Sequence, residues 1–339
     1  NSSLCFIPVL DQFTGRGSGM VFNITECVDF HQGKRIVITI LVCGHDVVII
    51  MHKEGDALLI QQPVYYPFRE VIEDNGRIFV NNQLHYEDGK YTIDFEDFEK
   101  KIVDNNVKVF ILCNPHNPVG RVWTKEELEK MGDICLKHNV VIMDDEIHCD
   151  FTYPGFKFTS FMTLDEKYHN SLVLYTSPSK TFNVAGLQPA NIIIKNPELR
   201  AAYRKANAAA GYSQGSIMGR VAVKSVYTKG DEWVNELVEY ITGNMNYMRD
   251  FVKENFPKAH FVDPEGTYLT WVDFSGYGFT DEELEHIMVE EAHLWLDSGK
   301  VFGPATAQFE RFNLACPRAT VVKAMEQLKA ALDNHTKWA

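Results

Sequence analysis

The chain has 339 residues, with 33 basic and 46 acidic side chains, and its formal net charge is −13. Hydrophobic residues make up 45% and charged residues 23%, which excludes disordered, collagen-like and small disulfide-bonded classes. A chain of this length is expected to form about two domains. The acidic balance disfavours nucleic acid as a partner, because a negative surface repels phosphate backbones.

Seven cysteines are scattered along the chain, at positions 5, 27, 43, 113, 135, 149 and 316, without a C-x-x-C pair. An odd, scattered set is typical of a reduced compartment, so we expect a cytoplasmic protein. No secretory leader is visible. The longest apolar run, 36–51, carries His45 and Asp46 and is shorter than the roughly 20 residues that cross a bilayer. We interpret it as buried core and expect no membrane partner.

The middle of the chain alternates short β-branched runs with longer helical periods, whereas the segment 1–45 carries no pattern that assigns it. Such alternation predicts an α/β domain with a largely parallel sheet. Near-continuous apolar runs predict strands that are covered on both faces. These runs are 57–61, 107–113, 140–143, 172–176 and 191–194.

The N-terminus of one helix between these strands can be recognised from its capping residues. Thr124 and Glu127 form a capping box, and Leu128, Met131 and Leu136 follow as its expected buried face. Ligands of parallel sheets bind at the carboxyl ends of strands. The loops that follow the predicted strands are therefore the candidate site.

A second region begins near residue 240 and predicts a smaller α+β unit. Thr280 and Glu283 form a capping box there as well. We therefore expect a large domain at 46–239 and a small domain at 240–339. The predicted elements are a helix at 231–255, a strand at 267–272, the helix capped by Thr280, a strand at 309–314 and a last helix at 320–332.

Three loops after predicted strands carry chemistry-bearing side chains. The loop 114–120 is Asn-Pro-His-Asn-Pro-Val-Gly, which alone could be a proline-rich turn. The segment 144–148 is Asp-Asp-Glu-Ile-His, whose adjacent carboxylates are costly unless a positive group faces them; a solvated turn and a metal site are the alternatives. The loop 177–183 is Ser-Pro-Ser-Lys-Thr-Phe-Asn, in which a lone lysine could be a surface residue.

In this order and spacing, the three loops resemble the pyridoxal-phosphate-dependent aminotransferase class I/II superfamily of fold type I. The wording Asn-Pro-His-Asn-Pro, Asp-Glu-Ile-His and Pro-Ser-Lys-Thr-Phe-Asn is similar to its cystathionine β-lyase (C–S lyase) branch. The resemblance covers 55–331. It implies a large domain with a mostly parallel central sheet flanked by helices, a smaller α+β C-terminal domain, and pyridoxal 5′-phosphate as cofactor.

The resemblance also implies roles for individual residues. Lys180 would form the Schiff base with the cofactor aldehyde and move the α-proton of the substrate. Asp145 would face the pyridine nitrogen and keep it protonated. Asn117 and His148 would hydrogen-bond the phenolic oxygen of the cofactor, with Asn117 also at the substrate. Tyr65 would stack on the ring.

Further roles concern the cofactor phosphate and the substrate. Ser177 and Ser179 would hold the phosphate, and Arg311 would clamp the α-carboxylate of the substrate with a bidentate fork. Tyr66 is the alternative stacking ring, and Arg318 is the alternative clamp. No metal is implied.

The sequence departs from many aminotransferases at two places. Gln188 stands eight residues after Lys180, where they carry a phosphate-binding arginine, and this favours the lyase branch. The segment 43–48 is a poor match to the usual phosphate-binding turn. The resemblance further implies a homodimer. The aromatic loops 65–68 and 151–156 would expose apolar area on a monomer unless they pack inside the large domain.

The leading hypothesis is an enzyme that breaks the Cβ–S bond of cystathionine or cysteine conjugates and releases pyruvate, ammonia and a thiol. The alternative is an aminotransferase with the same cofactor, since both reactions share one carbanion. A second alternative is a catalytically impaired binding or regulatory protein that keeps the fold.

Overall fold

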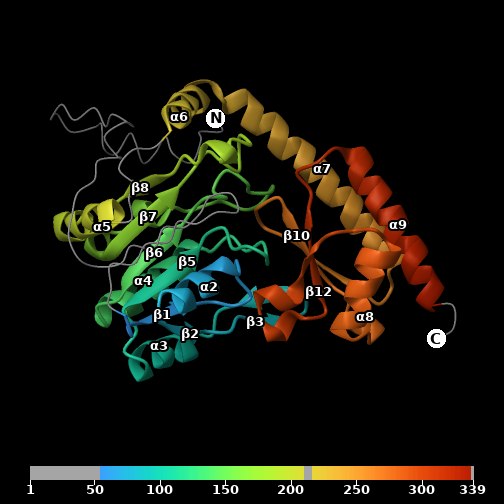
Figure 1. The fold of residues 1–339 in the computed structure, drawn as a ribbon, viewed down its shortest axis with the longest axis horizontal. Coiled ribbons are helices and arrows are strands. Elements are labelled where there is room, and N and C mark those ends of the chain that lie inside the picture. Colours follow the sequence, from blue (N-terminus) through green and yellow to red (C-terminus); the bar gives the residue numbers. More distant parts are fainter. Residues whose placement is uncertain (1–53, 210–215, 337–339) are drawn as a thin grey trace.

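The structure, a computed structural model, describes residues 54–209 and 216–336. The run 36–51 and the segment 43–48 lie outside the described residues. The described part contains two main sheets, one of six strands and one of four. The helix α7 (Asp231–Asn255) begins where Trp233 donates to the carbonyl of Thr181 and then packs along the four-stranded sheet (Figure 1).

The six-stranded sheet has the order β2-β1-β5-β6-β7-β8. Its first five strands are parallel and β8 is antiparallel, so the predicted α/β class is confirmed. The five predicted strands are all present, with ends shifted by at most two residues. The strands are β1 (Ala57–Ile60), β2 (Ile78–Asn81), β5 (Val109–Cys113), β6 (Val141–Asp145), β7 (Leu172–Thr176) and β8 (Asn191–Ile193).

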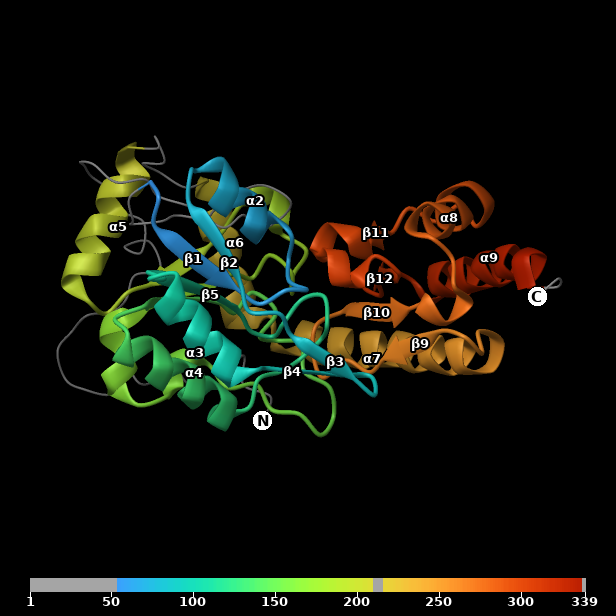
Figure 2. The ribbon, with the colours of Figure 1, turned by 90° about the horizontal axis from the view of Figure 1, so that it is seen from below.

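Helices cover both faces of this sheet, which explains its continuous apolar strands. The helices α3 (Phe95–Asp104) and α4 (Lys125–Lys137) pack on one face. The helices α2 (Pro67–Asp74) and α5 (Pro197–Ala209) pack on the other (Figure 2). The hairpin of β3 (His85–Glu87) and β4 (Lys90–Thr92), the strand β2 and the helices α2, α3 and α5 were not anticipated from the sequence.

The capping box of α4 is confirmed, with Thr124 accepting from the backbone of Glu127 and Glu127 from that of Thr124. The predicted buried face is only partly right. Leu128 and Met131 are buried, but Leu136 is 37% exposed and Cys135 is buried instead. A residue four positions after Met131 stays on the same helical face, whereas one five positions later turns toward solvent.

The four-stranded sheet has the order β11-β12-β10-β9 and forms the α+β unit expected from the sequence. Its core packs against α7, α8 and α9. The capping box of α8 is confirmed, and α7 has the predicted bounds. The remaining elements are α6 (Ile217–Lys229), β9 (His260–Val262), β10 (Leu269–Asp273), α8 (Asp281–His286), which continues as a π-helix (Ile287–Glu291), β11 (Asp297–Ser298), β12 (Phe309–Asn313) and α9 (Arg318–Thr336).

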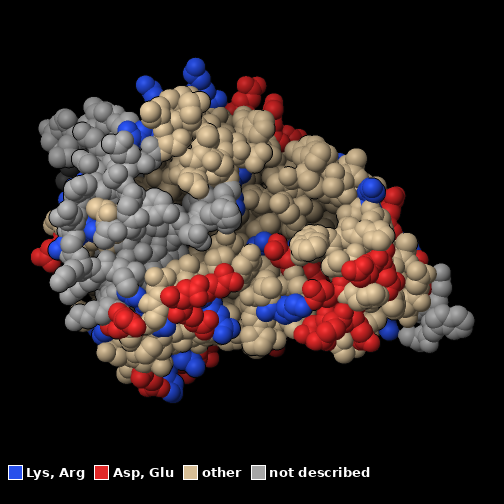
Figure 3. Space-filling model, viewed as in Figure 1, with Lys and Arg blue, Asp and Glu red and all other residues tan. Residues whose placement is uncertain are grey.

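Residue 240 lies inside α7, so the helix runs without interruption across the expected boundary between 46–239 and 240–339. That division remains a prediction. Within the described residues, no helix is both long and apolar enough to span a bilayer. Acidic side chains gather over α8, whose first turn carries Asp281, Glu282 and Glu283 (Figure 3).

Candidate active site

A cavity of about 230 Å³ lies at the carboxyl ends of β5 and β6. Residues of the four-stranded sheet form its other side. Ligands of parallel sheets bind at this edge. The lining residues are Tyr65, Tyr66, Cys113, Asn117, Asp145, Ile147, His148, Lys180, Tyr268, Leu269, Arg311 and Asn313. Six of the eight site residues expected from the sequence are therefore brought together, and Ser177 and Ser179 are not.

The segment 144–148 was expected to follow its strand, but its first two residues belong to the strand. Asp144 and Asp145 are the last two residues of β6, because their backbones continue the ladder opposite Leu112 and Cys113 of β5. Side chains alternate along a strand. Asp145 accordingly lines the cavity and Asp144 does not.

The alternative of a solvated turn at this segment is wrong. Asp144, Asp145 and Glu146 are 0%, 5% and 2% exposed. An oxygen of Asp145 accepts from the backbone N–H of Ile147 at 3.1 Å. Burial raises the pKa of Asp145 to about 6, against the opposing effects of that hydrogen bond and of the charge on Lys180. A buried carboxylate of this kind is stabilised by a cationic partner in the cavity.

Asp144 and Glu146 form a buried acidic pair. An oxygen of Glu146 accepts from the backbone N–H of Phe161 at 2.9 Å, and neither oxygen of Asp144 has a hydrogen-bond donor. Burial, and then the charge of Glu146, raise the pKa of Asp144 well above its ordinary value. Asp144 therefore takes up a proton more readily than an exposed aspartate does. Within 54–209 and 216–336, no cluster of side chains is suited to hold a metal ion.

His148 lines the cavity and is 3% exposed. Its ring packs edge-on against Tyr268, with ring centres 5.3 Å apart, and its Nδ1 has no hydrogen-bond partner. Burial, and then the charges of Lys180 and Arg311, lower the pKa of His148 well below its ordinary value. The imidazole is therefore neutral, with one buried nitrogen available to a ligand.

Arg311 reaches the cavity from β12 of the four-stranded sheet. Its Nη1 donates to Oδ1 of Asn117 at 2.8 Å, so the four-stranded sheet and the loop after β5 meet in the cavity. Arg318, the alternative carboxylate clamp, donates instead to Asn244 at 2.7 Å and lies over the ring of Tyr247, outside the cavity lining. This placement favours Arg311 over Arg318.

The aromatic wall consists of Tyr65 and Tyr66, whose ring centres are 5.7 Å apart. Both residues line the cavity, so the structure does not choose between the two as the stacking ring. Tyr66 also contacts the ring of Phe302, edge to face at 5.8 Å. An amphipathic aromatic pair of this kind can hold a flat ring.

The two serines of the lysine loop are turned into the protein. The hydroxyl of Ser177 donates to that of Ser179 at 2.7 Å, and both hydroxyls lie against the carbonyl oxygen of Pro189. Both residues are buried and neither lines the cavity. Their expected phosphate contact remains a prediction. Gln188 is exposed and has a left-handed backbone, with φ of 53°.

Some lining residues were missed from the sequence, namely Cys113, Ile147, Tyr268, Leu269 and Asn313. One of them had a readable signal. Asn313 stands two positions after Arg311 on a strand, and residues two apart share a face. Tyr268 had none, since it reaches the cavity only because the two sheets pack together.

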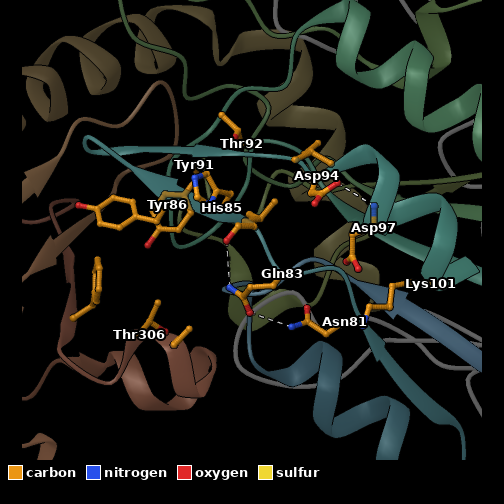
Figure 4. A pocket seen from close by; sticks show the side chains of 14 residues that line it. Asn81, Gln83, His85, Tyr86, Tyr91, Thr92, Asp94, Asp97, Lys101 and Thr306 are labelled. Atoms are coloured by element: carbon orange, nitrogen blue, oxygen red, sulfur yellow. Dashed lines mark hydrogen bonds between the residues drawn. The ribbon is translucent and has the colours of Figure 1, made fainter.

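A larger cavity, of about 850 Å³, lies beside the β3–β4 hairpin (Figure 4). Two of its polar side chains already have partners: Asn81 donates to Gln83 at 3.1 Å, and Gln83 donates to the carbonyl of Gln62 at 2.9 Å. No residue that lines it has a buried polar side-chain atom without a partner. The smaller cavity therefore has the stronger case as a reactive site.

Comparison with known proteins agrees with this geometry. The family described as aminotransferase class I and II matches residues 43–328. The chain belongs to this family, and the resemblance seen in the three loops is confirmed.

Several relatives of this chain are named as lyases. The chain is 41% identical over 278 residues to the cystathionine beta-lyase PatB of Bacillus subtilis, covering 82% of this chain and 72% of that protein. Among solved structures, it resembles cystalysin of Treponema denticola, which contains pyridoxal 5′-phosphate, with a TM-score of 0.83 and 38% identity over 84% of this chain and 73% of that one. It also resembles the PLP-bound C–S lyase of Staphylococcus hominis, with a TM-score of 0.76 and 34% identity over 83% and 72%.

Proposed function

We propose that the chain binds pyridoxal 5′-phosphate in the 230 Å³ cavity and cleaves the Cβ–S bond of L-cystathionine or of cysteine conjugates, releasing pyruvate, ammonia and a thiol. The observation that carries the proposal is the convergence of Lys180, Asp145 and His148 with Arg311 in one cavity. The lyases among its relatives support the same reaction.

The residues present fit the cofactor. The buried Asp145 suits a protonated pyridine nitrogen, the amine of Lys180 suits the aldehyde, and the unpartnered Nδ1 of His148 suits a polar ring substituent beside Asn117. Tyr65 or Tyr66 would cover a ring face. When bound, the cofactor supplies an electron sink for the carbanion at the substrate α-carbon.

The protein side chains then have separate tasks. The Nζ of Lys180 takes the proton from the substrate α-carbon. The guanidinium of Arg311 holds the α-carboxylate, and Asn117 keeps that guanidinium beside the cofactor site. Asp145 holds a proton on the pyridine nitrogen by its negative charge. Together these groups place the α-proton within reach of Lys180.

The test is incubation of the cofactor-loaded protein with L-cystathionine in the absence of any 2-oxo acid. We expect equal amounts of pyruvate and thiol. Lys180→Ala should abolish both products and the borohydride-reducible yellow adduct, whereas Lys157→Ala, at an exposed site, should change neither. An adduct that persists in Lys180→Ala would contradict the assignment.

The same assay separates the alternatives. Turnover that requires a 2-oxo acid acceptor would indicate an aminotransferase, which the family description allows. Bound cofactor without either activity would indicate a binding or regulatory protein. Release of pyruvate without an acceptor supports the lyase alone.

We also propose a cytoplasmic homodimer. No disulfide links the cysteines of the described residues, which suits a reduced compartment. The aromatic loops expected at the interface give little support for a dimer, since Phe68, Phe151 and Tyr153 are buried within the chain and only Phe156 among their phenylalanines is exposed, at 46%. Better support comes from an apolar face of α6, where Ile217, Met218 and Val221 are 77%, 63% and 54% exposed.

A further inference from the structure

The guanidinium of Arg311 is held from two sides. Nη1 donates to Asn117 at 2.8 Å, and Nη2 donates to an oxygen of Asp297 at 2.5 Å. Its central carbon lies 4.9 Å from the centre of the ring of Phe302, which is buried. Two hydrogen bonds and a ring face together fix both the position and the plane of this group.

Asp297 approaches the guanidinium from outside the cavity. It does not line the cavity, whereas Arg311 and Asn117 do. Asp297 on β11 and Arg311 on β12 are direct partners across the antiparallel ladder. The side chain of Asp297 is 44% exposed, against 11% for Arg311. Asp297 therefore contacts Arg311 from the side that faces solvent.

This arrangement leaves donors for a ligand. A guanidinium has five N–H donors, and the two hydrogen bonds use one on each terminal nitrogen. The Nε–H is buried without a partner. A carboxylate in the cavity can be gripped bidentately only if the guanidinium plane is already set, because a free arginine side chain loses rotamer entropy on binding.

We infer that Asp297 is a positioning residue, which sets the plane of Arg311 for the α-carboxylate of the amino-acid substrate. This inference rests on the proposed function, which supplies that substrate. Since the Asp297 carboxylate is partly exposed, water screens its charge, and the hydrogen bond it accepts is the main contribution.

The test compares the affinities of L-alanine and L-alaninamide for the cofactor-loaded protein by titration calorimetry. The amide lacks the carboxylate, so the ratio of the two affinities measures the grip of Arg311. We expect Asp297→Ala to lower this ratio by about tenfold. Asp297→Asn keeps an acceptor oxygen and should stay within about twofold of the unmodified protein.

The matched control is Asp263→Ala, which removes another Arg–Asp pair, with Arg249, in the same part of the chain but outside the cavity lining. It should leave the ratio unchanged. Thermal unfolding of each variant checks that it is folded. In turnover, Asp297→Ala should raise the KM for L-cystathionine by about tenfold and change kcat by less than about threefold.

Three results would overturn the inference. The first is an affinity ratio of L-alanine to L-alaninamide in Asp297→Ala that stays within twofold of the ratio in the unmodified protein. The second is a decrease of this ratio in Asp297→Asn as large as the decrease in Asp297→Ala. The third is an unmodified protein that binds L-alanine and L-alaninamide equally well. If the unmodified protein releases no pyruvate from L-cystathionine, the proposed lyase function fails. The affinity ratio still decides the role of Asp297 in that case.

Discussion

Three acidic side chains follow one another at the end of β6, yet only one of them lines the cavity. The alternation of the strand sends Asp145 into the cavity and Asp144 into the protein, where burial and the charge of Glu146 raise its pKa well above the ordinary value. The pKa of each of these similar neighbours is thus set by the direction of its side chain and by what surrounds it.

The substitution Asp145→Asn tests this difference. Under the proposed function it removes the negative charge that would hold a proton on the pyridine nitrogen, so kcat/KM for L-cystathionine should fall by a factor of about 10³ or more, equivalent to about 4 kcal/mol. Asp144→Asn keeps the shape of a side chain that does not line the cavity and should retain activity within about tenfold. The opposite pattern in steady-state kinetics would show that the pyridine partner is Asp144.

Glu310 stands next to Arg311 but is 2% exposed. Burial, and then the charges of Glu285 and Asp297, raise its pKa to about 8 from an ordinary value of 4.5, while Lys300 acts in the opposite direction. Between these two pH values the folded protein binds more protons than the unfolded chain. Stability from this group is therefore lost as the pH rises from about 4.5 to about 8.

Glu310→Gln should remove that loss. We expect the variant to be more stable than the unmodified protein by about 1–3 kcal/mol at pH 9, with the difference vanishing toward pH 4.5. Urea unfolding at several pH values measures it. A difference that is independent of pH would show that Glu310 is charged in the folded protein throughout this range.

At the scale of elements, one arginine joins the loop after β5 to both parts of the molecule. Arg121 donates to Glu127 of α4 at 2.9 Å, to Glu265 before β10 at 2.9 Å, and to the carbonyl of Tyr91 on β4. Its guanidinium also lies 4.7 Å from the centre of the Trp123 ring. This network holds the loop that carries Asn117.

Arg121→Met keeps much of the side-chain volume but leaves two carboxylates, each 21% exposed, without their partner. We expect the free energy of unfolding to fall by about 2–4 kcal/mol. Arg69→Met is the control, since its pair with Glu73 is about half exposed and contributes less than about 1 kcal/mol. Equal effects of both variants in urea unfolding would contradict a structural role for the network.

At the scale of the whole molecule, the apolar face of α6 is the main support for a dimer. We expect light scattering at micromolar concentration to give the mass of two chains. An obligate interface buries upwards of about 2,000 Å² in total, and a charge at its centre is strongly disfavoured. Val221→Glu should therefore shift the mass toward one chain, while Val301→Glu, at a 44% exposed site elsewhere, should not. A mass of one chain for the unmodified, cofactor-bound protein would refute the dimer.

The elements that were predicted correctly depend on local rules. The strand β7 and the helix α7 have their predicted bounds, and the capping boxes at Thr124 and Thr280 form as expected. Side-chain periodicity and end-capping act over a few residues, so they can be read along the chain. The segments 114–120, 144–148 and 177–183 could be identified for a related reason, since each one lies at the end of a strand with a recognisable apolar run.

The sequence by itself therefore determined the fold class, five strands of the larger sheet, the helix α7, and six of the residues that line the cavity. Only the tertiary structure decided which of them meet. It brings Arg311 to Asn117 across 194 positions, adds Asp297 behind the guanidinium, and turns Ser177 and Ser179 into the protein. Such contacts depend on how two sheets pack and on what that packing buries, and neither quantity is encoded in any short stretch of the chain.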